Sequence, residues 1–398
     1  MASLPTRAQV LETLFQCWQP IYETETIPVQ AALGRVLAQD QYAQVTIPVA
    51  RASAMDGVAV CSARFQQSTP DAGSWKLGVD FCRADTGDDF DDRFDAVLPI
   101  EQVKISAEGQ LTISENIAVR SGDNVRSRGS TIRVGELVAM RHRQLRPFDL
   151  ACLAMGGIAQ VEVYRAPRMA FLPTGSELVP LGAPVGRGQN IDSNSVLAQA
   201  MLTEMGAEPL CYPIVPDQPD ALAAALEQAL QAADVVLLNG GSSKGAEDFN
   251  TRMLEARGAV LFHWVAAAPG KPMCVAVIQN KPIINLLGPP LAVPYGMDWC
   301  VRAMVHRLLH KPMPRRQSIR RILTQPIHAP SDMEILCMMD VQPTQDGYLV
   351  KQKPWRRGSM ADALGAGAVY VTELGREVCP AGEPLEGNPS AGAGGFLA

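Results

Sequence analysis

Residues 220–241 read DALAAALEQALQAADVVLLNGG. Alanine and leucine recur at helical spacing through 220–233, which predicts a strongly amphipathic helix, and DVVLLNGG predicts a strand that ends at two glycines. The alternation continues on both sides: MAFLPTG (169–175), NSVLAQAMLTEMG (194–206), PLCYPIVP (209–216) and KPIINLLG (281–288) predict strand, helix, strand and strand. Strands alternating with helices predict a parallel α/β sheet.

The segments outside this sheet predict three further parts. Residues 6–39 carry helical spacing, with Thr6 as N-cap and a break at Gln19 and Pro20, which predicts two helices joined by a turn. Short β-like runs between turn residues follow, and prolines 312 and 314 mark a linker to more short strands. We therefore expect an α/β multidomain protein: a helical, elongated stalk (1–46 with 140–166), a small inserted β-rich domain (47–139), a central α/β domain (167–311) and a C-terminal β domain (312–398).

Charge, cysteine content and the N-terminal sequence argue against a nucleic-acid-binding, a membrane or a secreted protein. A chain of 398 residues exceeds what one hydrophobic core usually serves, and a net charge of -6 gives no basic field for nucleic acid or anionic membranes. The N-terminus has no apolar signal region, and we expect no membrane segment. Nine cysteines without a CxxC pair suggest reduced thiols, so we expect a cytoplasmic protein.

Glycine-bearing turns follow three of the expected strands, where an open α/β sheet binds ligands. They are Pro173-Thr174-Gly175-Ser176-Glu177, Asn239-Gly240-Gly241-Ser242-Ser243-Lys244-Gly245 and Leu287-Gly288-Pro289-Pro290. The middle turn continues through Ser242, Ser243, Lys244 and Gly245, which offer donors to a phosphate. One such loop alone is more often an ordinary turn between strand and helix. Lys271 lies between two prolines in PGKP, which restricts the turn and aims its ammonium group.

Two further stretches carry acidic residues. Small residues surround Asp56 in ASAMDGVAV (52–60), which suggests that something must come close to this carboxylate. The run from Asp88 to Asp95 lacks the ligand spacing of a calcium loop and is interpreted as a solvated surface turn. No Ser/His/Asp arrangement and no GxGxxG signature occurs, so hydrolase and dehydrogenase functions lose most of their support.

Several motifs occur in the order seen in one family. SAMDG, the Thr86-Gly87 pair, DAVLPIEQ, PTGSEL, GQNIDSN, GGSSKG, PGKP and the tail GSMADALGAGAVYV together resemble the molybdopterin molybdenumtransferases and the E domain of gephyrin. The resemblance covers nearly the whole chain. It implies an enzyme that receives adenylylated molybdopterin, uses a divalent metal such as Mg2+, releases AMP and inserts molybdate at the dithiolene. It also implies an elongated homodimer, with other cofactor-biosynthesis proteins or molybdoenzymes as candidate partners.

Motif matching assigns site residues by resemblance. Asp56, Thr86 and Glu177 fall on catalytic positions, and Asp56, Glu177 and Asp248 on metal-binding positions. The expected cofactor-binding residues are Thr174, Gly175, Asp192, Asn194, Gly240, Gly241, Ser242, Ser243, Lys244, Gly245, Lys271, Gly288 and Pro290. Carboxylates suit hard cations, and glycine amides and lysine suit phosphates.

The chain also departs from the family pattern. Thr131, Ser176 and Ala246 stand where the family usually has acids, and Ala268 replaces a lysine before PGKP. The family's Pro-Gly-Asn-Pro-x-Ser loop has become LGPPLA (287–292). Losing carboxylates removes metal ligands, so a catalytically impaired paralog that carries the cofactor, aids its insertion or regulates is the alternative to an active transferase. An unrelated nucleotide-binding module is a third, weaker hypothesis.

Overall fold

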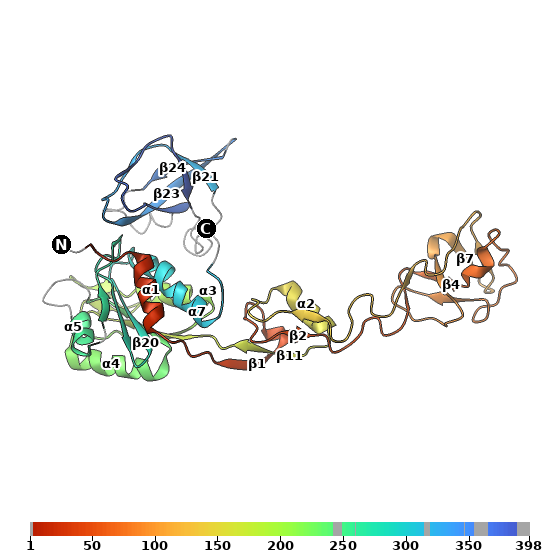
Figure 1. Ribbon diagram of the computed structural model, residues 1–398, viewed down its shortest axis with the longest axis horizontal. Helices are drawn as coiled ribbons and strands as arrows, with labels where there is room; N and C mark the ends of the chain where they lie inside the picture. Colours follow the sequence, from red (N-terminus) through yellow and green to blue (C-terminus); the bar gives the residue numbers. More distant parts are fainter. Residues whose placement is uncertain are drawn as a thin grey trace. The chain divides into compact units, whose positions relative to one another are not determined.

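A computed structural model describes residues 3–241, 249–258, 260–313, 319–345, 347–353 and 365–387. The chain divides into two compact units (Figure 1). Unit 1 comprises Met1–Glu23 and Tyr164–Ala398, and unit 2 comprises Thr24–Val163. The expected grouping of 1–46 with 140–166 differs from this division, because the first 23 residues lie with the α/β part.

The centre of unit 1 is a six-stranded mixed sheet in the order β15-β12-β16-β20-β19-β17. Its strands are β12 (Arg168–Pro173), β15 (Glu208–Cys211), β16 (Val235–Asn239), β17 (Val260–His263), β19 (Cys274–Ile278) and β20 (Lys281–Leu286). β15, β12, β16 and β20 are parallel, whereas β19 and β17 join antiparallel at one side. The predicted strands and their parallel pairing are therefore confirmed, and the antiparallel additions make the sheet mixed.

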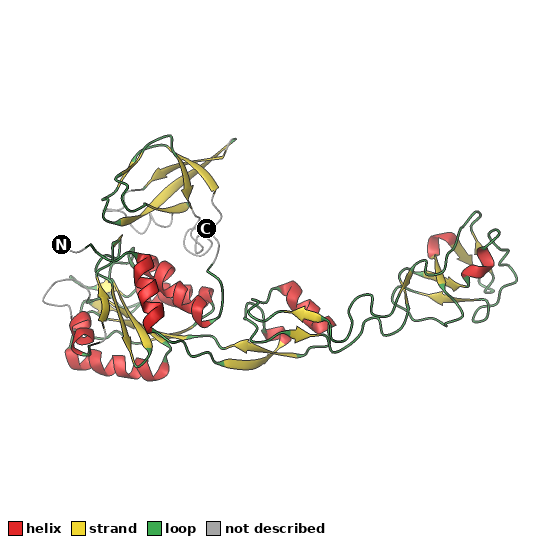
Figure 2. Cartoon of the chain, in the orientation of Figure 1, coloured by secondary structure: helices red, strands yellow, loops and turns green. Residues whose placement is uncertain are grey.

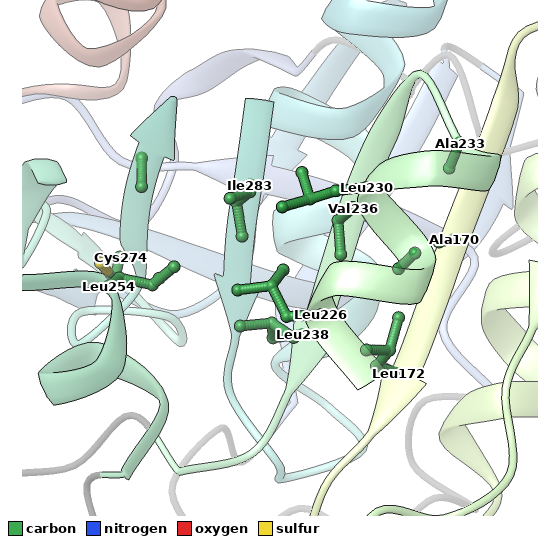
Figure 3. Packing of buried hydrophobic residues seen from close by; sticks show 12 residues of the cluster. Ala170, Leu172, Leu226, Leu230, Ala233, Val236, Leu238, Leu254, Cys274 and Ile283 are labelled. Carbon is green, nitrogen blue, oxygen red and sulfur yellow. The ribbon is translucent and has the colours of Figure 1, made fainter. Parts of the chain in front are cut away.

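Helices cover both faces of this sheet (Figures 1 and 2). They are α1 (Arg7–Cys17), α3 (Asn194–Met205), α4 (Pro219–Ala232), α5 (Phe249–Ala256) and a helical run made of α6 (Val293–Gly296), a π-helical turn (Met297–Val301) and α7 (Arg302–Leu308). Leucines 226, 230 and 254 of α4 and α5 pack on Val236, Leu238 and Ile283 of the strands (Figure 3). Burial on both faces explains why these strands are continuously apolar rather than alternating.

Helix boundaries follow the expected signals. Thr6 forms a capping box with Gln9 at the start of α1, and Gly206 ends α3 in the left-handed conformation with φ of 91°. The second helix expected before Gln39 is wrong: that segment holds strand β1 (Thr24–Pro28) and a 3-10 turn (Val29–Ala31). β1 pairs with β11 (Gln160–Tyr164), so a two-stranded ribbon replaces the predicted helix.

The last part of unit 1 is the predicted β domain. Its larger sheet has the order β18-β23-β24-β21-β27, with β25 also pairing with β23, and its core includes Ile335, Cys337, Met339 and Val350. The strands are β18 (Ala267–Ala268), β21 (Ile319–Leu323), β22 (Ile327–His328), β23 (Glu334–Thr344), β24 (Gly347–Gln352), β25 (Ala368–Val371), β26 (Val378–Cys379) and β27 (Pro384–Gly387). β18 lies more than fifty residues before the other strands of this sheet, so one strand of the sheet comes from the α/β part of the chain.

Unit 2 holds short strands and one helix, as expected. Its remaining elements are β2 (Gln41–Tyr42), β3 (Ala52–Ser53), β4 (Gly57–Val60), β5 (Phe81–Ala84), β6 (Ala96–Pro99), β7 (Val103–Ile105), β8 (Leu111–Ile113), β9 (Val125–Arg126), β10 (Leu137–Ala139) and α2 (Pro147–Met155). β4 lies between β5 and β6 in an antiparallel sheet over a core that includes Phe81, Leu98 and Leu111. Across the described residues, no helix has both the length and the apolar character needed to cross a membrane.

Candidate functional site

Three loops meet at the carboxyl edge of the parallel strands. Thr174 follows β12, and both its amide and its hydroxyl donate to Asn239 O at the end of β16, over 2.9 and 3.1 Å. Asn239 Nδ2 in turn donates to Leu287 O in the loop after β20, over 2.7 Å. The predicted glycine turns are therefore tied to one another at one edge, as the parallel topology requires.

Buried asparagines connect these loops further. Asn194 Nδ2 donates to Asn239 Oδ1 and to Gly288 O, over 2.8 and 2.7 Å. Asn250, at the start of α5, donates to Thr174 Oγ1 and to Gly240 O, over 3.0 and 2.9 Å. Because all three asparagines are at least nine-tenths buried, these bonds are shielded from water and fix the relative positions of the loops.

Glycine is required at the β16 turn by close packing. A Cβ at Gly240, whose φ is 123°, would lie 2.4 Å from Thr174 O, and one at Gly241 would lie 3.1 Å from Asn250 Nδ2. The amides of Gly240 and Gly175 already donate to Leu286 O and Val215 O, over 3.1 Å each. Both amides are therefore satisfied within the chain, and the small size of these glycines allows the loops to approach one another. Gly175 and Gly240 stay predicted cofactor-binding positions.

The Lys271 turn lies after β18. Lys271 is half-buried, and its Nζ is 5.9 Å from the centre of the Trp264 ring. Val265 N donates to Lys271 O over 2.9 Å, and Met273 N donates to Gly270 O over 3.0 Å, so the turn is closed by backbone bonds. These bonds fix the backbone from which the Lys271 side chain extends, and binding of an anion by its ammonium group stays a prediction.

Two carboxylates lie at the turn after β12. The carboxylate of Glu177 folds over Gly175, where a Cβ would meet Glu177 Oε2 at 2.6 Å. Asp217 Oδ2 accepts a bond from Ser176 N over 3.0 Å, and Ser176 Oγ accepts one from Asp217 N over 3.2 Å. Ser176 is thus joined to an acid from elsewhere in the sequence, at the position where the family pattern has an acid.

Asp192 has a different local role. Its carboxylate accepts bonds from the amide and the hydroxyl of Ser195, over 3.1 and 2.5 Å. These bonds cap the first turn of α3 and orient Asn194 into the buried asparagine network. Pro290, after Gly288, lies in the short exposed loop that leads into α6.

Asp56 and Thr86 lie together in unit 2. Asp56 Oδ1 accepts bonds from Thr86 N and Thr86 Oγ1, over 2.7 Å each. The amide bond and then the hydroxyl bond lower the pKa of Asp56, so this exposed carboxylate is ionised at neutral pH. The small neighbour at Gly57 has a structural cause, since a Cβ there would lie 1.8 Å from Leu98 O of β6. The backbone of β6, and not a ligand, is what comes close at this glycine.

Several predicted positions lie outside the described residues. They are Ser242, Ser243, Lys244, Gly245, Ala246 and Asp248. Thr131 is exposed in unit 2, and its amide donates to Ile47 O over 3.0 Å. Within the described ranges, no group of three or more His, Cys, Asp or Glu side chains is placed to hold a metal ion.

Sequence reasoning missed Asn250, Asn285 and Asp217, whereas Asn239 opens the middle predicted turn. Asn250 joins the loops, and its Nδ2 also lies 3.4 Å from Asn285 Oδ1 in β20. Asn285 occurs inside an apolar strand, and a fully buried amide among Ile and Leu is a signal that could have found it. Asp217 had no signal, because only the fold brings it to Ser176.

Known proteins match this chain over most of its length. Two family descriptions apply: the MoeA N-terminal region (domain I and II) over residues 6–157, and the probable molybdopterin binding domain over residues 170–307. The molybdopterin molybdenumtransferase of Haemophilus influenzae is 32% identical over 297 residues, covering 72% of this chain and 73% of that protein. The chain belongs to the molybdopterin molybdenumtransferase family. The resemblance found in the motifs is thereby confirmed.

Other relatives support the assignment and the fold. A molybdopterin molybdenumtransferase of a Nostoc species is 30% identical over 309 residues, covering 73% of this chain and 70% of that protein. The crystal structure of the molybdopterin biosynthesis moea protein from Pyrococcus horikosii covers 96% of this chain and 99% of its own, with a TM-score of 0.79 and 24% identity. The latter likeness shows the multidomain α/β fold.

Proposed function

We propose that this chain is a transferase of molybdenum cofactor biosynthesis that binds adenylylated molybdopterin, inserts molybdate at its dithiolene and releases AMP. Membership of the family is the observation that carries the proposal. The loops joined by Thr174, Asn194 and Asn239 support it, because a rigid edge of three loops suits a large anionic ligand.

Charged side chains would bind the ligand, and uncharged side chains would shape the site and position its loops. Lys271 would pair with a phosphate oxygen, and Gly241 would lie near the same group. Thr174, Gly288 and Pro290 would shape the walls of the site, while Asn194 and Asn250 keep the loops in place. The lowered pKa keeps Asp56 ionised and makes it a weak base, so its carboxylate is better suited to bind a cation than to accept a proton.

Magnesium would be held mainly through the substrate. The described residues offer single carboxylates, such as Glu177, rather than a cage of three acids. Mg2+ commonly binds one or two carboxylates together with substrate phosphates, so this donor set fits a metal that arrives with the ligand. The metal would neutralise phosphate charge there. Asp56 and Asp248 are the other proposed ligands.

We also propose a homodimer, in the cytoplasm. Tyr42 and Leu137 are cross-strand partners on β2 and β10, and both are about half exposed. On the neighbouring helix α2, Phe148 is 79% exposed and Met155 is 46% exposed. Exposed aromatic and aliphatic side chains gathered on one part of unit 2 suit a second copy of the chain, as the resemblance implies. None of the nine cysteines, all within the described ranges, forms a disulfide, in keeping with a reducing compartment.

Two carboxylate variants test the assigned site. Asp56→Ala and Glu177→Ala should lose molybdate-dependent AMP release by at least about a hundredfold, the usual scale for a catalytic side chain. Both variants should remain folded, because both carboxylates are exposed. Asp89→Ala and Glu204→Ala, also exposed, are the matched controls and should turn over like the wild type. Full activity of Asp56→Ala and Glu177→Ala would contradict the assigned roles.

A further inference from the structure

The strand that leads into the Lys271 turn is held from both sides. Ala266 N donates to Pro5 O near the N-terminus over 2.8 Å, and Ala266 O accepts a bond from Glu334 N over 3.0 Å. Strand β18 (Ala267–Ala268) then pairs parallel with the start of β23. Pro5 near the N-terminus and the start of β23 therefore fix the backbone that immediately precedes Pro269 and Lys271.

An ion pair joins these two flanking segments. Arg7 Nε and Nη2 donate to the two carboxylate oxygens of Glu334, over 2.6 and 2.9 Å. The two side chains are only 20% and 18% exposed, so the pair is largely shielded from solvent. Burial by itself would lower the pKa of Arg7, yet the bond to Glu334 and the neighbouring charges outweigh it and raise that pKa. Two parallel bonds also fix the angle between the partners.

Arg7 also contacts Tyr295, which lies next to the Lys271 turn. Its guanidinium lies 5.5 Å from the centre of the Tyr295 ring. Tyr295 is buried, and its Cδ1 is the nearest atom to a Cβ built on Gly270, at 3.9 Å. Arg7 therefore packs on Tyr295, and Tyr295 lies against Gly270. The Lys271 turn is supported by Tyr295 beneath Gly270 and by Glu334 at β18.

We propose that Arg7 and Glu334 act as a positioning pair that holds the Lys271 turn in the orientation needed to bind an anionic group of the substrate. Neither residue touches the ligand. Their removal should therefore weaken binding of the anion and leave the chemical step almost unchanged. The identity of that anion, a phosphate of adenylylated molybdopterin, rests on the proposed function, whereas the support of the turn does not.

The test compares Arg7→Met, Glu334→Gln and the double variant with the wild type. Each single variant should raise the KM for adenylylated molybdopterin about tenfold and change kcat by less than twofold. A tenfold change corresponds to weakening one charge-assisted hydrogen bond between Lys271 and the anion. The double variant should resemble the single ones, because either change alone breaks the pair. Arg7→Lys, which keeps the charge and loses the paired geometry, should lie between.

Hydrogen exchange of the peptide that spans residues 264–273 gives a readout without turnover. The amides of Val265 and Met273 should exchange faster in Arg7→Met and Glu334→Gln. The control pair is Arg168 and Glu208, register partners at the starts of β12 and β15, with Nε and Oε2 3.7 Å apart. Arg168→Met and Glu208→Gln should change neither exchange nor KM. If the wild type releases no AMP, the Kd of adenylylated molybdopterin replaces KM. Unchanged exchange at 264–273, or faster exchange with unchanged affinity, would overturn the proposal, and neither result depends on turnover.

Discussion

Replacing Gly240 with alanine should disrupt the carboxyl edge of the sheet. The new Cβ would lie 2.4 Å from Thr174 O and 2.7 Å from Thr174 Oγ1, and the residue would have to keep a φ of 123°. Backbone strain of this kind costs about 1–3 kcal/mol, and overpacking a rigid contact costs about 1–3 kcal/mol more. The free energy of unfolding of unit 1 should therefore fall by about 2–6 kcal/mol, with loss of pterin binding.

Two other glycines provide matched controls for this variant. Gly258 has a φ of 69° with no atom within 4 Å of its Cβ position, so Gly258→Ala should cost only the strain of about 1–2 kcal/mol. Gly288, in the next loop, has open space and no positive φ, so Gly288→Ala should stay within about 0.5 kcal/mol.

Urea unfolding followed by tryptophan fluorescence measures these differences. Trp75 is the one tryptophan in the sequence of unit 2, so a Trp75→Phe background restricts the signal to unit 1. The account predicts the order Gly240→Ala, Gly258→Ala, Gly288→Ala from most to least destabilised. If Gly240→Ala is as stable as Gly288→Ala and still binds pterin, Thr174 does not pack closely against this turn.

Three further outcomes are expected. Asn250→Leu removes donors to Thr174 Oγ1 and Gly240 O, and should cost about 2–3 kcal/mol in urea unfolding and weaken pterin binding; retained affinity would argue against its positioning role. Burial, then the charges of Lys311 and Arg302, lower the pKa of His306 despite its bond to Pro312 O, so the unfolded chain binds more protons and stability should fall as the pH drops below 6.5. His306→Gln should flatten that pH dependence, and an unchanged slope would exclude His306 as its source. Phe148→Glu should convert the dimer to monomer in analytical ultracentrifugation, whereas a dimer that persists would place the interface elsewhere.

Much of the α/β part could be predicted from the sequence because its signals are local. The run from Val235 to Asn239 is apolar and ends in glycines, and it forms a central buried strand. Thr6 and Gly206 set helix ends through bonds within a few residues. Parallel topology then brings the three loops to one edge, so the position of the candidate site followed from the order of the elements.

What could not be predicted depends on partners far apart in the sequence. β1 is mostly exposed, and its pairing with β11, more than 130 residues away, has no local sign. The ties from Asn250 to Thr174 and from Asp217 to Ser176 likewise exist only once the chain is folded. The amides of Gly175 and Gly240 illustrate the same point, since their bonds to Val215 O and Leu286 O form only once the chain is folded.

AMP release by the purified wild-type protein is the most direct test of the central claim. Adenylylated molybdopterin and magnesium would be supplied with and without molybdate, and pterin binding would be followed in the same sample. The account predicts AMP release that requires molybdate. Tight pterin binding without AMP would contradict an active transferase and indicate a protein that holds or delivers the cofactor, and binding of free nucleotide without any pterin would contradict both functions.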